Sequence, residues 1–137
     1  MTATSPAPWL PFAAAKLFFL GAATGILVSA AYTEKIDASH EFLLAAHLNG
    51  LLGCFWLLGL DYTLPKVALG DGACLWLIRL TVLAAYANWL VTVVKSFLKV
   101  RGVDYLGEGT NDAVFGILTL TVVIPTLTAS ALWAWGS

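Results

Sequence analysis

Charged residues are scarce in this chain of 137 residues, where they make up 11% of the sequence and hydrophobic residues make up 60%. A soluble domain carries about 25% charged residues. The deficit therefore predicts a membrane protein. The net charge of -1 also excludes the strongly basic surface that neutralises nucleic-acid phosphates, so we expect no nucleic-acid partner.

Residues that bind metals or form disulfides are equally few. The chain has two cysteines, Cys54 and Cys74, and two histidines, His40 and His47. The cysteines lie in apolar segments and form neither a CxxC pair nor a disulfide framework, so we interpret both as free, buried thiols. A zinc site needs three or four ligands, which argues against zinc. No positively charged side chain precedes the first apolar run, so we expect a retained first helix rather than a cleaved signal peptide.

Long apolar runs dominate what is present, and four of them approach the ~20 residues needed to cross a bilayer. They cover about residues 11–32, 40–62, 73–98 and 113–135. The loops between them are short. The pattern predicts an all-α integral membrane protein, with one domain (1–137) folded as an up-and-down bundle of four transmembrane helices. Ser39 is a predicted N-cap for the second span, and Pro125 predicts a kink with a freed carbonyl in the fourth.

Ionisable groups recur along the second span at intervals of seven residues, nearly two helical turns, and so share one stripe. They are His40, His47, Cys54 and Asp61. We expect this stripe to face another helix or a cofactor rather than lipid. Ionisable groups inside a membrane are costly and point to function, which makes His47 the leading functional candidate. Asn49 lies about 200° around the helix from it and should point to a different neighbour.

The third span carries two polar faces. Arg79 and Tyr86, seven residues apart, share one of them. The other face follows the spacing i, i+4, i+7, i+11 with Asn88, Thr92, Lys95 and Lys99. We expect Arg79 to extend to the membrane surface or to pair with Asp61 or Asp71.

A single strong ligand is enough for haem, because the porphyrin supplies the other nitrogens to the iron. An electron-transferring haem usually takes a second axial ligand from an opposite helix. Outside the second span the chain has no histidine, and its one methionine is Met1. If haem is bound, we therefore expect five-coordinate iron with one position open for substrate. Such a site suits non-redox Lewis-acid chemistry.

Two segments resemble the small four-helix membrane isomerase family of hydroxylaminobenzene mutase and styrene oxide isomerase. AHLNGLLGCFWLLGL (46–60) contains an AHL-x-G pattern, and AYANWLVTVVKSF (85–97) contains a YANW pattern. Chain length, the four spans and the polar loop before the fourth span agree as well. The resemblance implies a b-type haem (iron) held between subunits of a homo-oligomer, for which a trimer is one candidate. It also implies that His47 is the axial metal ligand.

The resemblance extends to residues around these motifs, whose amide and hydroxyl groups would orient the substrate and stabilise developing charge. The catalytic candidates are Asn49, Tyr86, Asn88 and Thr92. The cofactor-binding candidates are His47, Arg79 and Trp89. Two positions depart from the styrene oxide isomerases, which have an asparagine six residues after the axial histidine and a tyrosine further along the third span. Gly53 and Thr92 stand there in this chain.

We therefore expect a haem b-dependent membrane isomerase for a small hydrophobic substrate with an activated oxygen. It would convert an aryl hydroxylamine to an aminophenol, or an epoxide to an aldehyde, with ferric iron as the Lewis acid. Such substrates partition into the lipid bilayer, and we expect a multi-pass protein of the cytoplasmic (inner) membrane. The alternatives are N–N or azoxy bond formation from hydroxylamines, non-catalytic haem binding, and small-molecule transport. The first span lacks the carboxylate that small multidrug transporters need.

Overall fold

The computed structural model describes residues 6–137, so residues 1–5 of the predicted domain lie outside the described part. Every regular element in the described part is a helix. In chain order they are α1 (Leu10–Tyr32), α2 (His40–Thr63), the 3-10 helix η1 (Leu64–Lys66), α3 (Asp71–Leu98), α4 (Gly109–Leu118), the π-helical turn η2 (Thr119–Val123) and α5 (Ile124–Gly136). The last three are continuous, and we refer to them together as the fourth helix.

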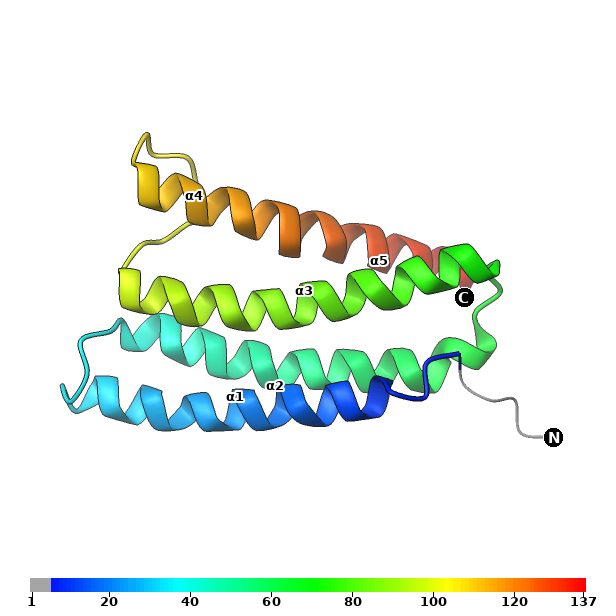
Figure 1. Cartoon of the computed structure of the whole chain (residues 1–137), viewed down its shortest axis with the longest axis horizontal. Helices are drawn as coiled ribbons and strands as arrows, with labels where there is room; N and C mark the ends of the chain where they lie inside the picture. The colour runs from blue at the N-terminus through cyan, green and yellow to red at the C-terminus, as the bar shows by residue number, and fades with distance from the viewer. Residues whose placement is uncertain (1–5) are drawn as a thin grey trace.

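The helices run alternately up and down, so that the start of α1 and the end of α5 lie at the same end of the bundle (Figure 1). All four are long and apolar enough to cross a membrane. The predicted fold class is therefore confirmed. Each predicted span agrees with its helix to within four residues at either end, because the apolar runs and the polar loops between them are sharply separated in the sequence.

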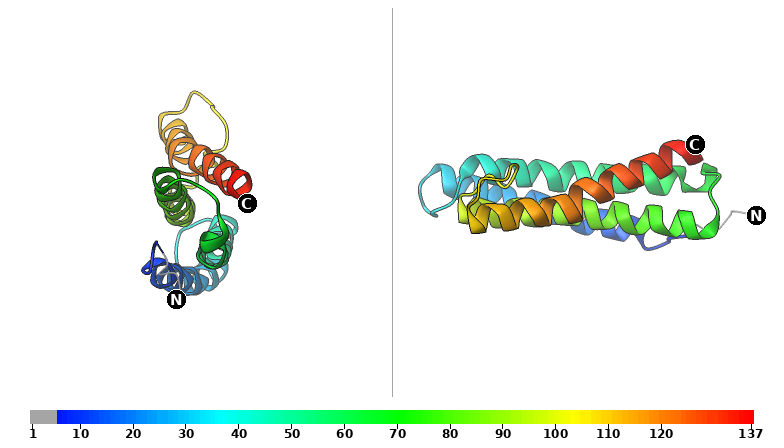
Figure 2. Two further views of the ribbon diagram at one scale, coloured as in Figure 1. Left: turned by 90° about the vertical axis from the view of Figure 1, so that its right-hand side faces the viewer. Right: turned by 90° about the horizontal axis from the view of Figure 1, so that it is seen from above.

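The helices are arranged as a staggered row rather than a closed square. α1 packs on α2, α2 on α3, and α3 on the fourth helix. Within the described residues, neither α1 nor α2 approaches the backbone of the fourth helix. Viewed along the helices, α1 lies at one side of the molecule and the fourth helix at the other (Figure 2). α2 and the fourth helix therefore flank α3 without backbone contact, although the Trp133 side chain lies close to Gly59 of α2.

α1 and α2 approach closely where two glycines meet. A Cβ added to Gly21 would lie 2.9 Å from the backbone of Gly50, and one added to Gly50 would lie 2.5 Å from the Gly21 Cα. Small residues of this kind let membrane helices bring their backbones together. The consequence here is that α2 side chains can reach the backbone carbonyls of α1.

The start of α2 is capped as predicted, because Ser39 Oγ accepts a hydrogen bond from the Phe42 backbone N–H at 3.3 Å. The predicted stripe of ionisable groups begins here and faces α1. His40 stacks on Tyr32 of α1 with ring centroids 4.2 Å apart. About four turns on, Cys54 is buried in the apolar core. The stripe is thus turned toward another helix rather than toward lipid.

Pro125 shapes the fourth helix. Proline has no N–H, so it cannot donate to the carbonyl of Thr121, four residues earlier. Directly before it the helix widens into η2, where the Ile124 N–H donates to the Thr119 carbonyl, five residues back. The ribbon changes direction at this point, as the predicted kink requires (Figure 2).

The loop between α3 and α4 is folded onto the start of α4 by Asn111, which is 2% exposed. Asn111 Oδ1 accepts a hydrogen bond from the Gly102 N–H at 2.8 Å, and its Nδ2 donates to the Asp104 carbonyl at 2.8 Å. One buried amide therefore satisfies two backbone groups of the loop and holds them in place.

Candidate functional site

His47 lies in α2 where that helix crosses α1. Its Nδ1 is 2.7 Å from the carbonyl oxygen of Gly21. The ring also lies against Gly25, where an added Cβ would meet Cε1 and Nδ1 at 3.3 Å. A carbonyl oxygen only accepts hydrogen bonds, so Nδ1 carries the proton and donates it. In this tautomer Nε2 keeps its lone pair.

Metal-ligating histidines commonly have this arrangement. They donate their second ring N–H to a backbone carbonyl or a carboxylate, which fixes the ring and makes the ligating nitrogen more basic. His47 is half-buried, so its own chain does not enclose it. The residues therefore fit a haem held by one histidine: Nε2 has no hydrogen-bond partner among the described residues, and the hydrogen bond to Gly21 fixes the tautomer.

Two aromatic side chains of α3 also reach α1. Trp89 Nε1 donates to Thr24 Oγ1 at 2.9 Å, within the turn of α1 that His47 contacts. Tyr86 Oη donates to the Ala13 carbonyl at 2.6 Å. Ala13 precedes Gly21 in α1 and lies roughly 12 Å from it along the helix axis. Trp89, a predicted cofactor-binding residue, is thus brought to the His47 turn, whereas the hydroxyl of Tyr86 is hydrogen-bonded away from it.

Arg79 is exposed on α3. Ion pairs among the residues that the structure describes include Lys99–Asp37 and Arg101–Asp104. The exposure of Arg79 agrees with a side chain that extends to the membrane surface, and its pairing with Asp61 or Asp71 remains a prediction. Its predicted role toward a cofactor stays a prediction.

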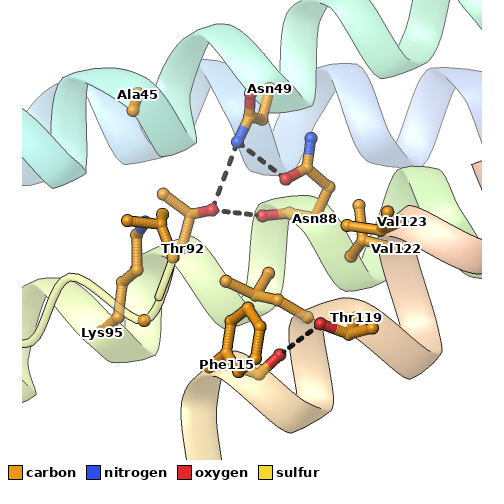
Figure 3. Close-up of a pocket in the computed structure, with 12 residues that line it drawn as sticks. Ala45, Asn49, Asn88, Thr92, Lys95, Phe115, Thr119, Val122 and Val123 are labelled. Carbon is orange, nitrogen blue, oxygen red and sulfur yellow. Dashed lines mark hydrogen bonds between the residues drawn. The ribbon is translucent and has the colours of Figure 1, made fainter. Parts of the chain in front are cut away.

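Asn49 points to α3, as its helical spacing from His47 predicts. Its Nδ2 donates to Asn88 Oδ1 and to Thr92 Oγ1, both at 3.2 Å. Thr92 Oγ1 donates in turn to the Asn88 carbonyl at 2.6 Å (Figure 3). We call Asn49, Asn88 and Thr92 the amide cluster. It brings together three of the four predicted catalytic residues, on a different side of α2 from His47.

Two partly open cavities border the amide cluster, and both are lined by residues of α2, α3 and the fourth helix. The first, which we call the amide cavity, has a volume of about 300 Å³. Besides the cluster, its lining includes Lys95, Phe115, Thr119 and Val122 (Figure 3). The second cavity also has a volume of about 300 Å³. It is lined by Asn49 and Asn88 together with Gly53, Trp56 and Thr126.

Lys95 and Lys99 follow Asn88 and Thr92 on the same predicted face of the third span, but in the structure they point to different places. Lys95 is 9% exposed, lines the amide cavity and donates from Nζ to the Arg101 carbonyl at 3.2 Å. Lys99 ends α3 in a left-handed conformation with φ of 55° and forms an ion pair with Asp37. The turn at the helix end is what removes Lys99 from the predicted face.

The model of the styrene oxide isomerase family matches residues 7–137. The chain belongs to this family. It is also 27% identical, over 127 residues, to the hydroxylaminobenzene mutase HabB of Ectopseudomonas oleovorans, a match that covers 88% of this chain and 74% of that protein. No solved structure gives a significant match. The resemblance seen in the sequence is therefore confirmed: this is an isomerase or mutase of that type and a multi-pass membrane protein.

One departure from the styrene oxide isomerases lies beside the second cavity. Gly53 stands where the resemblance leads us to expect an asparagine. A Cβ added to Gly53 would lie 2.8 Å from Leu17 Cδ2 and 3.4 Å from the Ala85 Cβ, so a larger residue there requires the Leu17 side chain to move. Asn49, one helical turn earlier, lines the same second cavity as Gly53. The chain therefore presents an amide to that cavity from a different position.

Proposed function

We propose that this chain is a haem b-dependent membrane isomerase that rearranges a small hydrophobic substrate bearing an activated oxygen. The observation that carries the proposal is the 2.7 Å hydrogen bond from His47 Nδ1 to the Gly21 carbonyl. It leaves Nε2 as a free ligand nitrogen in a helix apolar enough to cross a membrane. Family membership supports the reaction class, and the AHL-x-G motif supports haem as the group that His47 binds.

The haem would be held at His47. When bound, it supplies a Lewis-acidic ferric iron that weakens an N–O or C–O bond. The chain itself fixes the imidazole: the Gly21 carbonyl holds the tautomer and the ring orientation, and Gly25 leaves space for the ring beside α1. Trp89 contacts the same turn of α1 and is proposed to pack against the cofactor. Arg79 extends outward, where it is proposed to contact the cofactor from another part of the assembly.

The proposed assembly is a homo-oligomer, such as a trimer, in the cytoplasmic membrane with haem between subunits. A planar cofactor needs apolar surfaces on both of its faces. One chain offers only the α1–α2 surface beside the half-buried His47, and a second subunit would supply the other. The lipid bilayer surrounds this assembly and concentrates hydrophobic substrates around it.

Within this reaction class we favour an aryl hydroxylamine as substrate, converted to an aminophenol, over an epoxide converted to an aldehyde. The relative described above is named a hydroxylaminobenzene mutase. The chain has Gly53 where the resemblance to styrene oxide isomerases leads us to expect an asparagine. Asn49 is the first candidate to replace it in orienting the substrate. The other candidates are Tyr86, Asn88 and Thr92.

A turnover assay tests this proposal. The purified, haem-loaded protein is incubated with hydroxylaminobenzene or with styrene oxide in water enriched in ¹⁸O, without a reductant. An isomerase moves oxygen within one molecule. We therefore expect an aminophenol of the same mass as the substrate, with no ¹⁸O incorporated, and a slower or absent conversion of the epoxide.

The other products identify the alternatives. A product that joins two nitrogen centres, such as an azoxy compound, would replace the proposal with N–N bond chemistry. A haem-loaded protein that converts neither substrate would contradict the isomerase assignment and favour haem binding alone. His47→Ala is the matched inactive variant, since it removes only the proposed ligand.

A further inference from the structure

The amide cavity has a polar floor that is incompletely hydrogen-bonded. Asn49 Nδ2 donates two hydrogen bonds, and Asn88 accepts one hydrogen bond at Oδ1 and one at its backbone carbonyl. Among the described residues, Asn49 Oδ1 accepts no hydrogen bond and Asn88 Nδ2 donates none. Thr92, by contrast, both donates and accepts. The cluster therefore keeps one acceptor and two N–H donors for a ligand, within a mostly apolar surrounding.

The remaining walls of the cavity are suited to an aromatic ring. Phe115 and Val122 of the fourth helix face the cluster from the other side (Figure 3). Thr119 adds no free donor, because its hydroxyl donates back to the Phe115 carbonyl at 2.8 Å. A cavity of about 150 Å³ is enough for a benzene molecule. The amide cavity, at about 300 Å³, has room for one substituted ring.

The amide cavity is partly open, and the α3–α4 loop closes one end of it. Gly102 of the α3–α4 loop lines the closed end, where Asn111 binds its backbone. Lys95 lines the same end and donates to that loop. Within the described residues the backbones of α2 and the fourth helix do not approach each other, so entry between them requires no helix to unfold. A molecule dissolved in the bilayer can therefore enter from the side.

We propose that the amide cavity binds a single-ring aromatic molecule bearing a hydroxyl group, with the hydroxyl on the Asn49–Asn88 pair. A hydroxyl is the smallest group that both donates to Asn49 Oδ1 and accepts from Asn88 Nδ2. A lipid acyl chain fills the same volume but satisfies neither atom, which costs the binding free energy of both hydrogen bonds. Asn49 and Asn88 are also the proposed substrate-orienting residues, so the inference deepens the proposed function and rests on it for the nature of the bound ring. Because the cavity lies within one chain, binding can be measured without turnover.

Photolabelling of the full-length protein in mild detergent tests the inference. The probes are a phenol carrying a para diazirine and the toluene that carries the same diazirine, and labelled peptides are mapped by mass spectrometry. Labelling at the exposed Phe19 of α1 corrects for partition into the micelle. We expect the phenol to label residues 113–123 about tenfold more than the toluene does, the selectivity of two ordinary neutral hydrogen bonds. Unlabelled p-cresol should compete.

Matched variants assign the site. Asn88→Leu keeps the side-chain volume and should reduce phenol labelling to the toluene level, whereas Thr128→Val, on an exposed part of the fourth helix, should leave it unchanged. Val122→Trp fills the cavity without touching the amides and should abolish labelling by both probes, which keeps the test decisive if Asn88→Leu fails to fold. His47→Ala should label like the unsubstituted protein.

Three results would overturn the inference. Equal labelling of the unsubstituted protein by the two probes would mean that the amides do not recognise the hydroxyl. Labelling spread over all exposed apolar positions would mean that the probes report lipid contact. Loss of labelling in His47→Ala would assign the bound phenol to the haem site instead. Failure of the proposed isomerase activity would leave all of these measurements unaffected.

Discussion

Replacing Gly21 by alanine is the sharpest test of how the His47 site is built. The new Cβ would lie 2.9 Å from the Gly50 Cα and carbonyl carbon and from the Leu51 nitrogen. These are backbone atoms, so no side-chain rotation relieves the contact. Carbon atoms pack at about 3.5–4.0 Å, and α1 must therefore move away from α2 by roughly 0.6 Å or more.

The size of the effect follows from two contributions. Overpacking of this kind costs about 1–3 kcal/mol. The same displacement stretches the 2.7 Å hydrogen bond between His47 Nδ1 and the Gly21 carbonyl to the limit of hydrogen-bonding distance. That adds up to about 1 kcal/mol. We expect Gly21→Ala to lower the free energy of unfolding by about 2–3 kcal/mol and to reduce the haem content per chain.

The assay is unfolding by SDS in mild detergent, followed by circular dichroism, with haem absorbance recorded on the same samples. Gly116→Ala is the matched control, because Gly116 is also helical and a Cβ there would meet open space. It should be neutral or slightly stabilising. If Gly21→Ala and Gly116→Ala unfold together and hold equal haem, then the close α1–α2 contact does not support the histidine.

Two further predictions concern the ends of helices. Asn111→Leu removes both hydrogen bonds that hold the α3–α4 loop, so we expect a loss of about 2–3 kcal/mol and faster cleavage of residues 99–108 by protease; cleavage at the unsubstituted rate would contradict the role of Asn111. Ser39→Ala removes the cap of α2, and we expect about 1 kcal/mol of destabilisation with restoration by Ser39→Asp; an unchanged unfolding midpoint would show that the cap is dispensable.

Most of the fold could be predicted because its signals are local. Apolar runs separated by polar loops determine where the helices start and end. Ser39 sits at the boundary it was expected to cap. Pro125 removes an N–H wherever it occurs in a helix, so a disturbance of the fourth helix was predictable. That the disturbance takes the form of the η2 turn depends on neighbouring helices and was not.

The site was predictable where a polar group stands out in an apolar helix. His47 was identified in this way, and helical spacing correctly separated Asn49 from it. The residues that contact His47 and that line the amide cavity from other helices were not predictable. Gly21 contributes a backbone carbonyl, which no sequence pattern marks, and Phe115 is one of many apolar residues in its helix. These contacts depend on which helices become neighbours, and the row of helices emerges only from packing.

The measurement that tests the central claim most directly is the absorption spectrum of the protein purified in mild detergent after haem-replete expression. The account predicts a Soret band that is lost in His47→Ala while the helical circular dichroism is retained. His40→Ala, which removes the other histidine from its stack on Tyr32, should keep the band. A colourless unsubstituted protein, or a Soret band that persists unchanged in His47→Ala, would contradict the claim that His47 holds a haem.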